Sequence, residues 1–123
     1  MTARIYPVLT YDDAKAAIAW LGDAFGFEPH AVYEGENGMI DHAELKLDGA
    51  FLMLSSKRDN IWSESNGPIA VSLPEGIDTH FERAKSAGTE IISEPADTHY
   101  GSRDYSARDL EGNLWNFGTY VPG

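Results

Sequence analysis

The segment LDGAFLML, residues 47–54, recurs later in the chain as LEGNLWNF, residues 110–117. In both segments a leucine, an acidic residue and a glycine precede an apolar run, and the two glycines are 63 positions apart. Upstream of each, over 6–26 and 68–88, an apolar run is followed by a helix-like stretch and a closing glycine. Self-similarity at a fixed offset is typical of internal duplication. The sequence therefore predicts two copies of one unit.

Each copy is predicted to begin with a strand and a helix. The runs 5–9 and 68–73 are short, apolar and rich in strand formers. After the first run, Asp12 and Asp13 can cap a helix, and Gly26 supplies a stop. Apolar residues then keep helical spacing at Ala14, Ala17, Ile18, Leu21 and Phe25. A shorter stripe in the second copy consists of Ile77, Phe81 and Ala84.

Three further strands are expected after each helix. They fall at 28–34, 40–47 and 50–55 in the first copy, and at 89–93, 103–109 and 113–120 in the second. The unit is therefore βαβββ, and the fold class is α+β, with two tandem βαβββ modules forming curved mixed sheets around a cavity. We expect a single domain over 1–123, with module 1 at 1–56, a linker at 57–67 and module 2 at 68–123.

The Asp48-Gly49 pair predicts which side chains of the first hairpin share a face. A two-residue turn pairs Leu47 with Ala50. One face then carries side chains that must pack under a helix: Ala43, Leu45, Leu52 and Leu54. The opposite face, called here the open face, carries His42, Glu44, Lys46, Phe51, Met53 and Ser55.

The same reasoning applied to Glu111 and Gly112 places Trp115 and Phe117 on the helix side of the second hairpin. Its open face is then expected to carry Arg103, Tyr105, Ala107, Leu114, Asn116 and Tyr120. Contiguous apolar groups with a few polar ones favour a binding pocket, and full solvation of this face is the alternative.

Composition narrows the function classes. The formal net charge of −11 argues against nucleic acid as a partner, because phosphate binding needs clustered lysine and arginine. Neutral or cationic ligands fit better, although an acidic surface can also serve solubility alone. No segment is apolar for long enough to span a membrane, and neither a secretory signal nor a cysteine is present. We therefore expect a cytoplasmic protein.

Two segments resemble the vicinal oxygen chelate superfamily, which includes glyoxalase I, extradiol dioxygenases, fosfomycin resistance enzymes and bleomycin resistance proteins. YGSRDYSARDLEGNLWNFGTY, residues 100–120, resembles the closing hairpin of the glyoxalase and bleomycin resistance branch. GPIAVSLPEGIDTHFERAKSAG, residues 67–88, resembles its second strand and helix opening. The resemblance covers nearly the whole chain and implies paired βαβββ modules, a homodimer and a pocket at the mouth of the joined modules.

Metal-dependent members of that superfamily place ligands on the first and last strand of each module. The resemblance assigns those places to Tyr6, Met53, Pro68 and Asn116. Zinc and nickel need imidazole, thiolate or carboxylate donors, whereas proline offers none, methionine a soft thioether and asparagine a weak carbonyl. We therefore expect no metal and no other cofactor, which argues against glyoxalase I and dioxygenase chemistry.

His42 and Glu44 are the candidate catalytic residues, because both project from one face of one expected strand. Such a pair could bind a metal or transfer a proton, although alternate polar residues on a strand are common. The remaining histidines are expected to be surface or structural residues: His30, His80 and His99. The sequence holds no G-x-S-x-G elbow and no phosphate-binding glycine loop.

The first functional hypothesis is a metal-independent protein of the bleomycin resistance type, which sequesters a small aromatic or cationic compound. Trp62 lies in the polar linker, where it is expected to cover a pocket, contact a partner subunit or plug the edge of the core. The predicted ligand-binding residues are Glu44, Phe51, Met53, Trp62, Arg103, Tyr105 and Asn116. The alternative is a metal-dependent lyase, isomerase or dioxygenase related to glyoxalase I. A third hypothesis is an interaction module whose cavity is filled by its own side chains.

Overall fold

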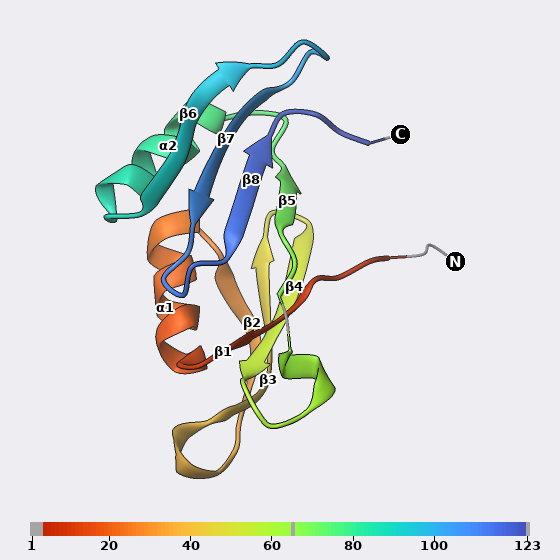
Figure 1. Ribbon diagram of the computed structural model, residues 1–123, viewed down its shortest axis with the longest axis vertical. Coiled ribbons are helices and arrows are strands. Elements are labelled where there is room, and N and C mark those ends of the chain that lie inside the picture. Colours follow the sequence, from red (N-terminus) through yellow and green to blue (C-terminus); the bar gives the residue numbers. More distant parts are fainter. Residues whose placement is uncertain (1–3, 65, 123) are drawn as a thin grey trace. The chain divides into compact units, whose positions relative to one another are not determined.

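The computed structural model describes residues 4–64 and 66–122, and it has two four-stranded sheets and two α-helices (Figure 1). The first copy contains β1 (Val8–Tyr11), α1 (Ala14–Phe25), β2 (Glu28–Glu34), the 3₁₀ turn η1 (Glu36–Gly38), β3 (Ile40–Leu47) and β4 (Ala50–Ser56). After the 3₁₀ turn η2 (Ile61–Ser63), the second contains β5 (Ile69–Ser72), α2 (Ile77–Ser86), β6 (Glu90–Asp97), β7 (Arg103–Arg108) and β8 (Leu114–Gly118). The α+β class and the repeated βαβββ unit are confirmed.

Both sheets have the same topology, as the duplication predicts. Their strand orders are β1-β4-β3-β2 and β5-β8-β7-β6. In each sheet the first strand of the unit runs parallel to the last, and the other neighbours are antiparallel. No helix within 4–64 and 66–122 is long and apolar enough to cross a membrane.

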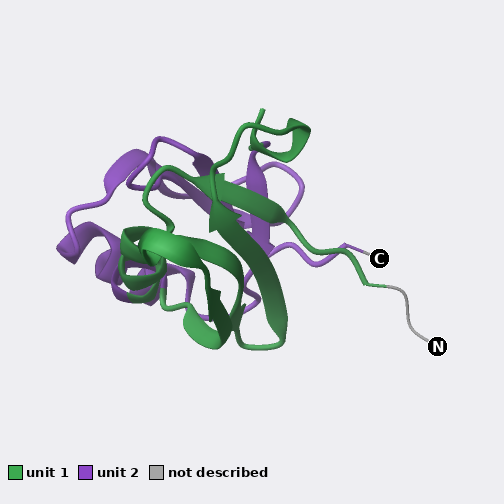
Figure 2. Cartoon of the chain, turned by 90° about the horizontal axis from the view of Figure 1, so that it is seen from below, with its two compact units in different colours: residues 1–22, 26–66 green, residues 23–25, 67–123 purple. Residues whose placement is uncertain are grey.

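The chain divides into two compact units, coloured separately in Figure 2. Unit 1 comprises residues 1–22 and 26–66, and unit 2 comprises residues 23–25 and 67–123. Asn66, in the expected linker, groups with unit 1 because its amide pairs with the backbone of Thr10 at 3.0 and 2.9 Å.

In unit 1 the predicted hairpin register is confirmed. Leu47 pairs with Ala50, and Asp48 has a φ of 52°, the left-handed conformation that the tight turn needs. The helix-side set Ala43, Leu45, Leu52 and Leu54 is no more than 1% exposed. The helix α1 also begins and ends as predicted, with the Asp13 carboxylate accepting from the Ala16 N–H at 3.0 Å and Gly26 at a φ of 84°.

In unit 2 the predicted register of the hairpin is wrong. The turn is not the two-residue Glu111-Gly112 turn but a longer loop over 109–113, so that Arg108 pairs with Leu114. Because side chains alternate between the two faces along a strand, a shift of one residue in the pairing places each β7 side chain on the face opposite to the one expected. Tyr105 and Ala107 therefore lie beside Phe117 and Trp115 on the helix face, and all four are fully buried.

Arg103 follows the same correction, since it lies two residues before Tyr105 on β7. Its guanidinium reaches Asp78 of α2 at 3.1 Å and Asp97 of β6 at 3.2 Å. Arg103 thus ties the helix to the sheet instead of lying on the open face. Asn116 does lie on the open face, where its amide contacts Ser106.

The core of unit 2 is built from stacked rings around His80. Phe25, from the last turn of α1, packs on Trp115 and Phe117 with ring centroids 5.2 and 4.8 Å apart. The His80 ring nitrogens contact the Phe25 carbonyl, at 2.8 Å from Nε2, and the Tyr105 hydroxyl. A surface or structural role was expected for His80, and these contacts give it a structural one.

Candidate functional site

A hollow lies on the open face of the first sheet, wholly within unit 1. It has a volume of about 220 Å³ and is lined by Arg4, Tyr6, His30, Glu44, Phe51 and Met53. Three of these lining residues, Glu44, Phe51 and Met53, were expected on this face from the hairpin register alone. The strand pairing explains their convergence, because Glu44 of β3 lies directly across from Met53 of β4.

Two other rings pack edge-on against the ring of Phe51 in the hollow. The Tyr6 ring meets it edge-on with centroids 6.4 Å apart, and the His30 ring does so at 5.2 Å. Both interplanar angles are 82°. Rings in this arrangement present flat apolar surface together with a polar tip, which suits a compound with an aromatic part.

His30 reaches the hollow through a β-bulge that the sequence reasoning missed. Pro29 pairs with Leu45 and Ala31 pairs with Glu44, so His30 is the extra residue between two consecutive pairs. Pro29 was the available signal, because proline has no N–H to give to a sheet ladder and is found in strands mainly at edges and bulges. A surface or structural role was expected for His30; the residue is exposed, and its ring lines the hollow.

Glu44 supplies a carboxylate to the hollow and is held by its neighbour on the strand. Its Oε2 lies 2.9 Å from His42 Nε2, and both side chains are partly exposed, at 31% and 39%. The ring of Tyr33, across from His42 on β2, lies 5.9 Å from the imidazole. The expected juxtaposition of His42 and Glu44 is confirmed, and a catalytic role for them stays a prediction.

Residues 5–117 match the family model of the Glyoxalase/Bleomycin resistance protein/Dioxygenase superfamily. The chain belongs to this superfamily. The crystal structure of TioX from Micromonospora sp. ML1 has a TM-score of 0.82 to this chain at 28% identity, and 98% of each chain is covered. A glyoxalase-related enzyme from Clostridium phytofermentans shares the fold at 17% identity, with a TM-score of 0.75 over 98% and 97% of the two chains. An uncharacterized protein of Mycobacterium bovis is 28% identical over 94% of this chain and 82% of its own length.

The metal chemistry found in parts of the superfamily does not fit the donors of this chain. At the four places in question, Tyr6 offers a phenol and Met53 a thioether, while Pro68 has no donor side chain. Asn116 already uses both ends of its amide, toward Ser106 and Asp104. In the part of the chain that the structure describes, no three His, Cys, Asp or Glu side chains gather in a way that could hold a metal ion.

The other predicted ligand-binding residues lie outside the hollow. Trp62 lies in η2 and is 71% exposed. Asn116 lies on the open face of the second sheet, while Tyr105 and Arg103 lie on its helix face. Of the seven predicted binding residues, the hollow in this superfamily member therefore contains three, Glu44, Phe51 and Met53.

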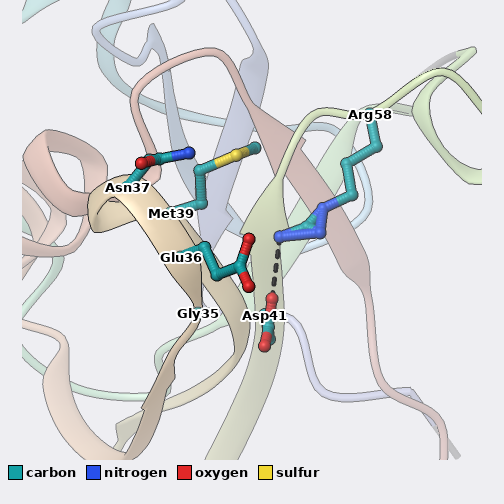
Figure 3. A pocket seen from close by; sticks show the side chains of 6 residues that line it. All are labelled: Gly35, Glu36, Asn37, Met39, Asp41 and Arg58. Atoms are coloured by element: carbon teal, nitrogen blue, oxygen red, sulfur yellow. Dashed lines mark hydrogen bonds and ion pairs between the residues drawn. The ribbon is translucent and has the colours of Figure 1, made fainter.

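A second hollow lies at the β2–β3 hairpin and has a volume of about 480 Å³ (Figure 3). It is lined by Gly35, Glu36, Asn37, Met39, Asp41 and Arg58. The guanidinium of Arg58 forms an ion pair with the Asp41 carboxylate at 2.8 Å. Since this larger hollow has no aromatic wall, the open-face hollow around Phe51 is the better candidate for a ligand site.

Proposed function

We propose that this superfamily member is a metal-independent binding protein that sequesters a small, partly aromatic or cationic compound in the open-face hollow of unit 1. The carrying observation is the convergence of the Tyr6 and His30 rings on Phe51 beside the Glu44 carboxylate. Ligand sites are typically apolar with a small number of polar groups that fix orientation. Sequestration needs no further chemistry.

The charge of the protein supports a preference for neutral or cationic ligands. The formal net charge is −11, and such a field attracts cations and repels anions. Within the hollow, Glu44 can accept hydrogen bonds from an amidinium or ammonium group. The proposal extends to a cytoplasmic homodimer whose binding of a toxic compound confers antibiotic resistance.

Three probes that share one ring and differ in charge test the binding role: benzamidine, benzyl alcohol and benzoate. Isothermal titration of the full chain is expected to show saturable binding of the first two, with benzamidine the tighter and benzoate the weakest. Phe51→Ala removes the central ring and is expected to weaken benzyl alcohol about tenfold. Glu44→Gln is expected to reduce the preference for benzamidine over benzyl alcohol.

Matched control variants keep the test specific to the hollow. Ile61→Ala removes an exposed apolar side chain from η2 of the same unit, and Glu28→Gln removes an exposed carboxylate from the same strand as His30. Both are expected to bind the probes as the unaltered protein does. The proposal fails if none of the probes saturates, or if Phe51→Ala and Ile61→Ala weaken binding equally.

The enzyme alternative rests on the contact of 2.9 Å between His42 and Glu44. A carboxylate in this position can orient an imidazole for proton transfer to a compound bound in the hollow. Metal analysis of protein purified without chelator separates this alternative from binding alone. Stoichiometric metal that disappears in His42→Ala would overturn the metal-independent proposal.

A further inference from the structure

We propose a second ligand site, in unit 2, where the Asp104 carboxylate and the rings of Tyr100 and Tyr120 receive an organic ammonium group. This group of three residues is called the Asp104 corner. It lies where the β6–β7 hairpin meets the chain after β8, and it shares no residue with the hollow around Phe51.

The Asp104 carboxylate is half-buried and accepts hydrogen bonds from three side chains. It accepts hydrogen bonds from the Ser102 hydroxyl, from Asn116 Nδ2 at 3.2 Å and from the Tyr100 hydroxyl at 3.3 Å. Among the residues that the structure describes, it forms no ion pair with lysine, arginine or histidine. A carboxylate has roughly four lone-pair positions, so one position is left for a ligand.

The backbone leaves room for this carboxylate at Gly118. Asp104 and Gly118 are directly paired across β7 and β8, and a Cβ added to Gly118 would lie 2.3 Å from Asp104 Oδ1. Any side chain at this position would displace the carboxylate. Gly118 therefore leaves room for the carboxylate on the open face of the second sheet, and the three hydrogen bonds it accepts hold it there.

The ring of Tyr100, whose hydroxyl donates to the carboxylate, stands at nearly a right angle to the ring of Tyr120. The Tyr100 and Tyr120 centroids are 5.8 Å apart with an interplanar angle of 86°, and about half of each side chain is exposed. Exposed aromatic faces next to a carboxylate are the elements that recognise ammonium groups, through cation–π attraction and charge pairing.

Hydrogen bonds hold the backbone that carries both tyrosines in place before a ligand arrives. The Tyr120 N–H donates to the Ser102 hydroxyl at 3.1 Å, and the Tyr120 carbonyl accepts from Ser72 at 2.8 Å. The turn that carries Tyr100 is closed by a contact of 2.7 Å from the Thr98 N–H to the Ser102 carbonyl. Preorganised groups of this kind lose little conformational entropy on binding.

Choline chloride tests the Asp104 corner, with 3,3-dimethylbutan-1-ol as an uncharged probe of nearly the same shape. In a titration of the isotopically labelled full chain followed by NMR, choline is expected to shift the amide signals of Ser102, Asp104 and Gly118 in a saturable way. The uncharged probe is expected to bind those residues at least about tenfold more weakly.

Variants separate the charge from the rings. Asp104→Asn is expected to weaken choline binding about tenfold, and Tyr120→Leu is expected to weaken it about threefold. The control Glu94→Gln removes a charge from β6 of the same sheet and is expected to have no effect. The Tyr120 variant keeps the test decisive if Asp104→Asn unfolds. The inference is overturned if choline and its uncharged analogue bind alike, or if neither variant weakens choline.

The outcome for this site is distinguishable from the outcome for the proposed function. Benzyl alcohol reports on the hollow around Phe51, and choline reports on the Asp104 corner. If choline shifts the amide signals of residues around the Phe51 hollow alone, the inference of a second site is refuted, while the proposed binding role of the hollow stands.

Discussion

Replacing Asp109 by alanine is expected to be one of the most destabilising single changes in unit 2. Asp109 is 6% exposed and closes the loop between β7 and β8. Its Oδ1 accepts from the backbone N–H groups of Glu111 and Asn113, each at 3.0 Å. Its Oδ2 accepts from Asn113 Nδ2 and from Trp115 Nε1, again at 3.0 Å.

The size of the effect follows from these contacts. A hydrogen bond to a charged group contributes about 1.5–3 kcal/mol, and a buried donor that loses its acceptor costs about 1–3 kcal/mol. The contacts share one carboxylate and are not additive, so the loss in unfolding free energy for Asp109→Ala is about 3–5 kcal/mol. For a chain of this length, that lowers the melting temperature by roughly 10–20 °C.

Urea denaturation followed by circular dichroism measures the loss directly. Asp59→Ala is the matched control, because Asp59 is an exposed aspartate in the loop after β4, and its change is expected to stay within about 0.5 kcal/mol. A loss below about 1 kcal/mol for Asp109→Ala would refute the reasoning, since it would mean that the loop keeps its conformation without the carboxylate.

Three further changes probe the cores and the second sheet. Burial lowers the pKa of His80 below its ordinary 6.5, so the contribution of His80 to the unfolding free energy is expected to be constant above pH 6.5 and to be lost as the pH falls from 6.5 to the lowered value. His80→Gln should flatten this slope in urea titrations at stepped pH. Gly118→Ala is expected to destabilise more than Gly67→Ala, because only the former drives a Cβ into Asp104 and neither glycine has a left-handed φ, and equal melting temperatures would contradict this. Leu45→Ala should cost about 2–5 kcal/mol in denaturant titrations, and a smaller loss would show that the core of unit 1 can collapse around the gap.

The first hairpin could be predicted from the sequence because its turn is governed by backbone geometry alone. Asp48 and Gly49 form a two-residue turn, and the register and both faces of β3 and β4 follow from it. The open-face residues Glu44, Phe51 and Met53 were placed correctly for that reason. They are also the residues that the hollow brings together.

The second hairpin could not be predicted in the same way because a side chain governs its loop. Glu111 and Gly112 look like the first turn, but the Asp109 carboxylate caps a longer loop and shifts the pairing by one residue. Tyr105 then moves to the buried face, which changes the content of the site. The aspartate four residues before Asn113 was the signal that the motif comparison overlooked.

The bulge at His30 shows a second limit of pattern reading. Strict alternation assigns each strand residue to one of two faces, and a bulge inserts a residue that alternation does not count. His30 consequently joins the hollow beside Phe51 without any periodic signal. Pro29 indicates the position of the bulge, but it does not predict the direction in which the His30 side chain points.

A crystal structure of the full chain grown with benzamidine tests the binding role of the hollow most directly. We expect the probe's ring against Phe51, near Tyr6 and His30, with its amidinium at the Glu44 carboxylate. Density for benzamidine elsewhere on the protein, with the wall around Phe51 bare, would contradict the proposed function.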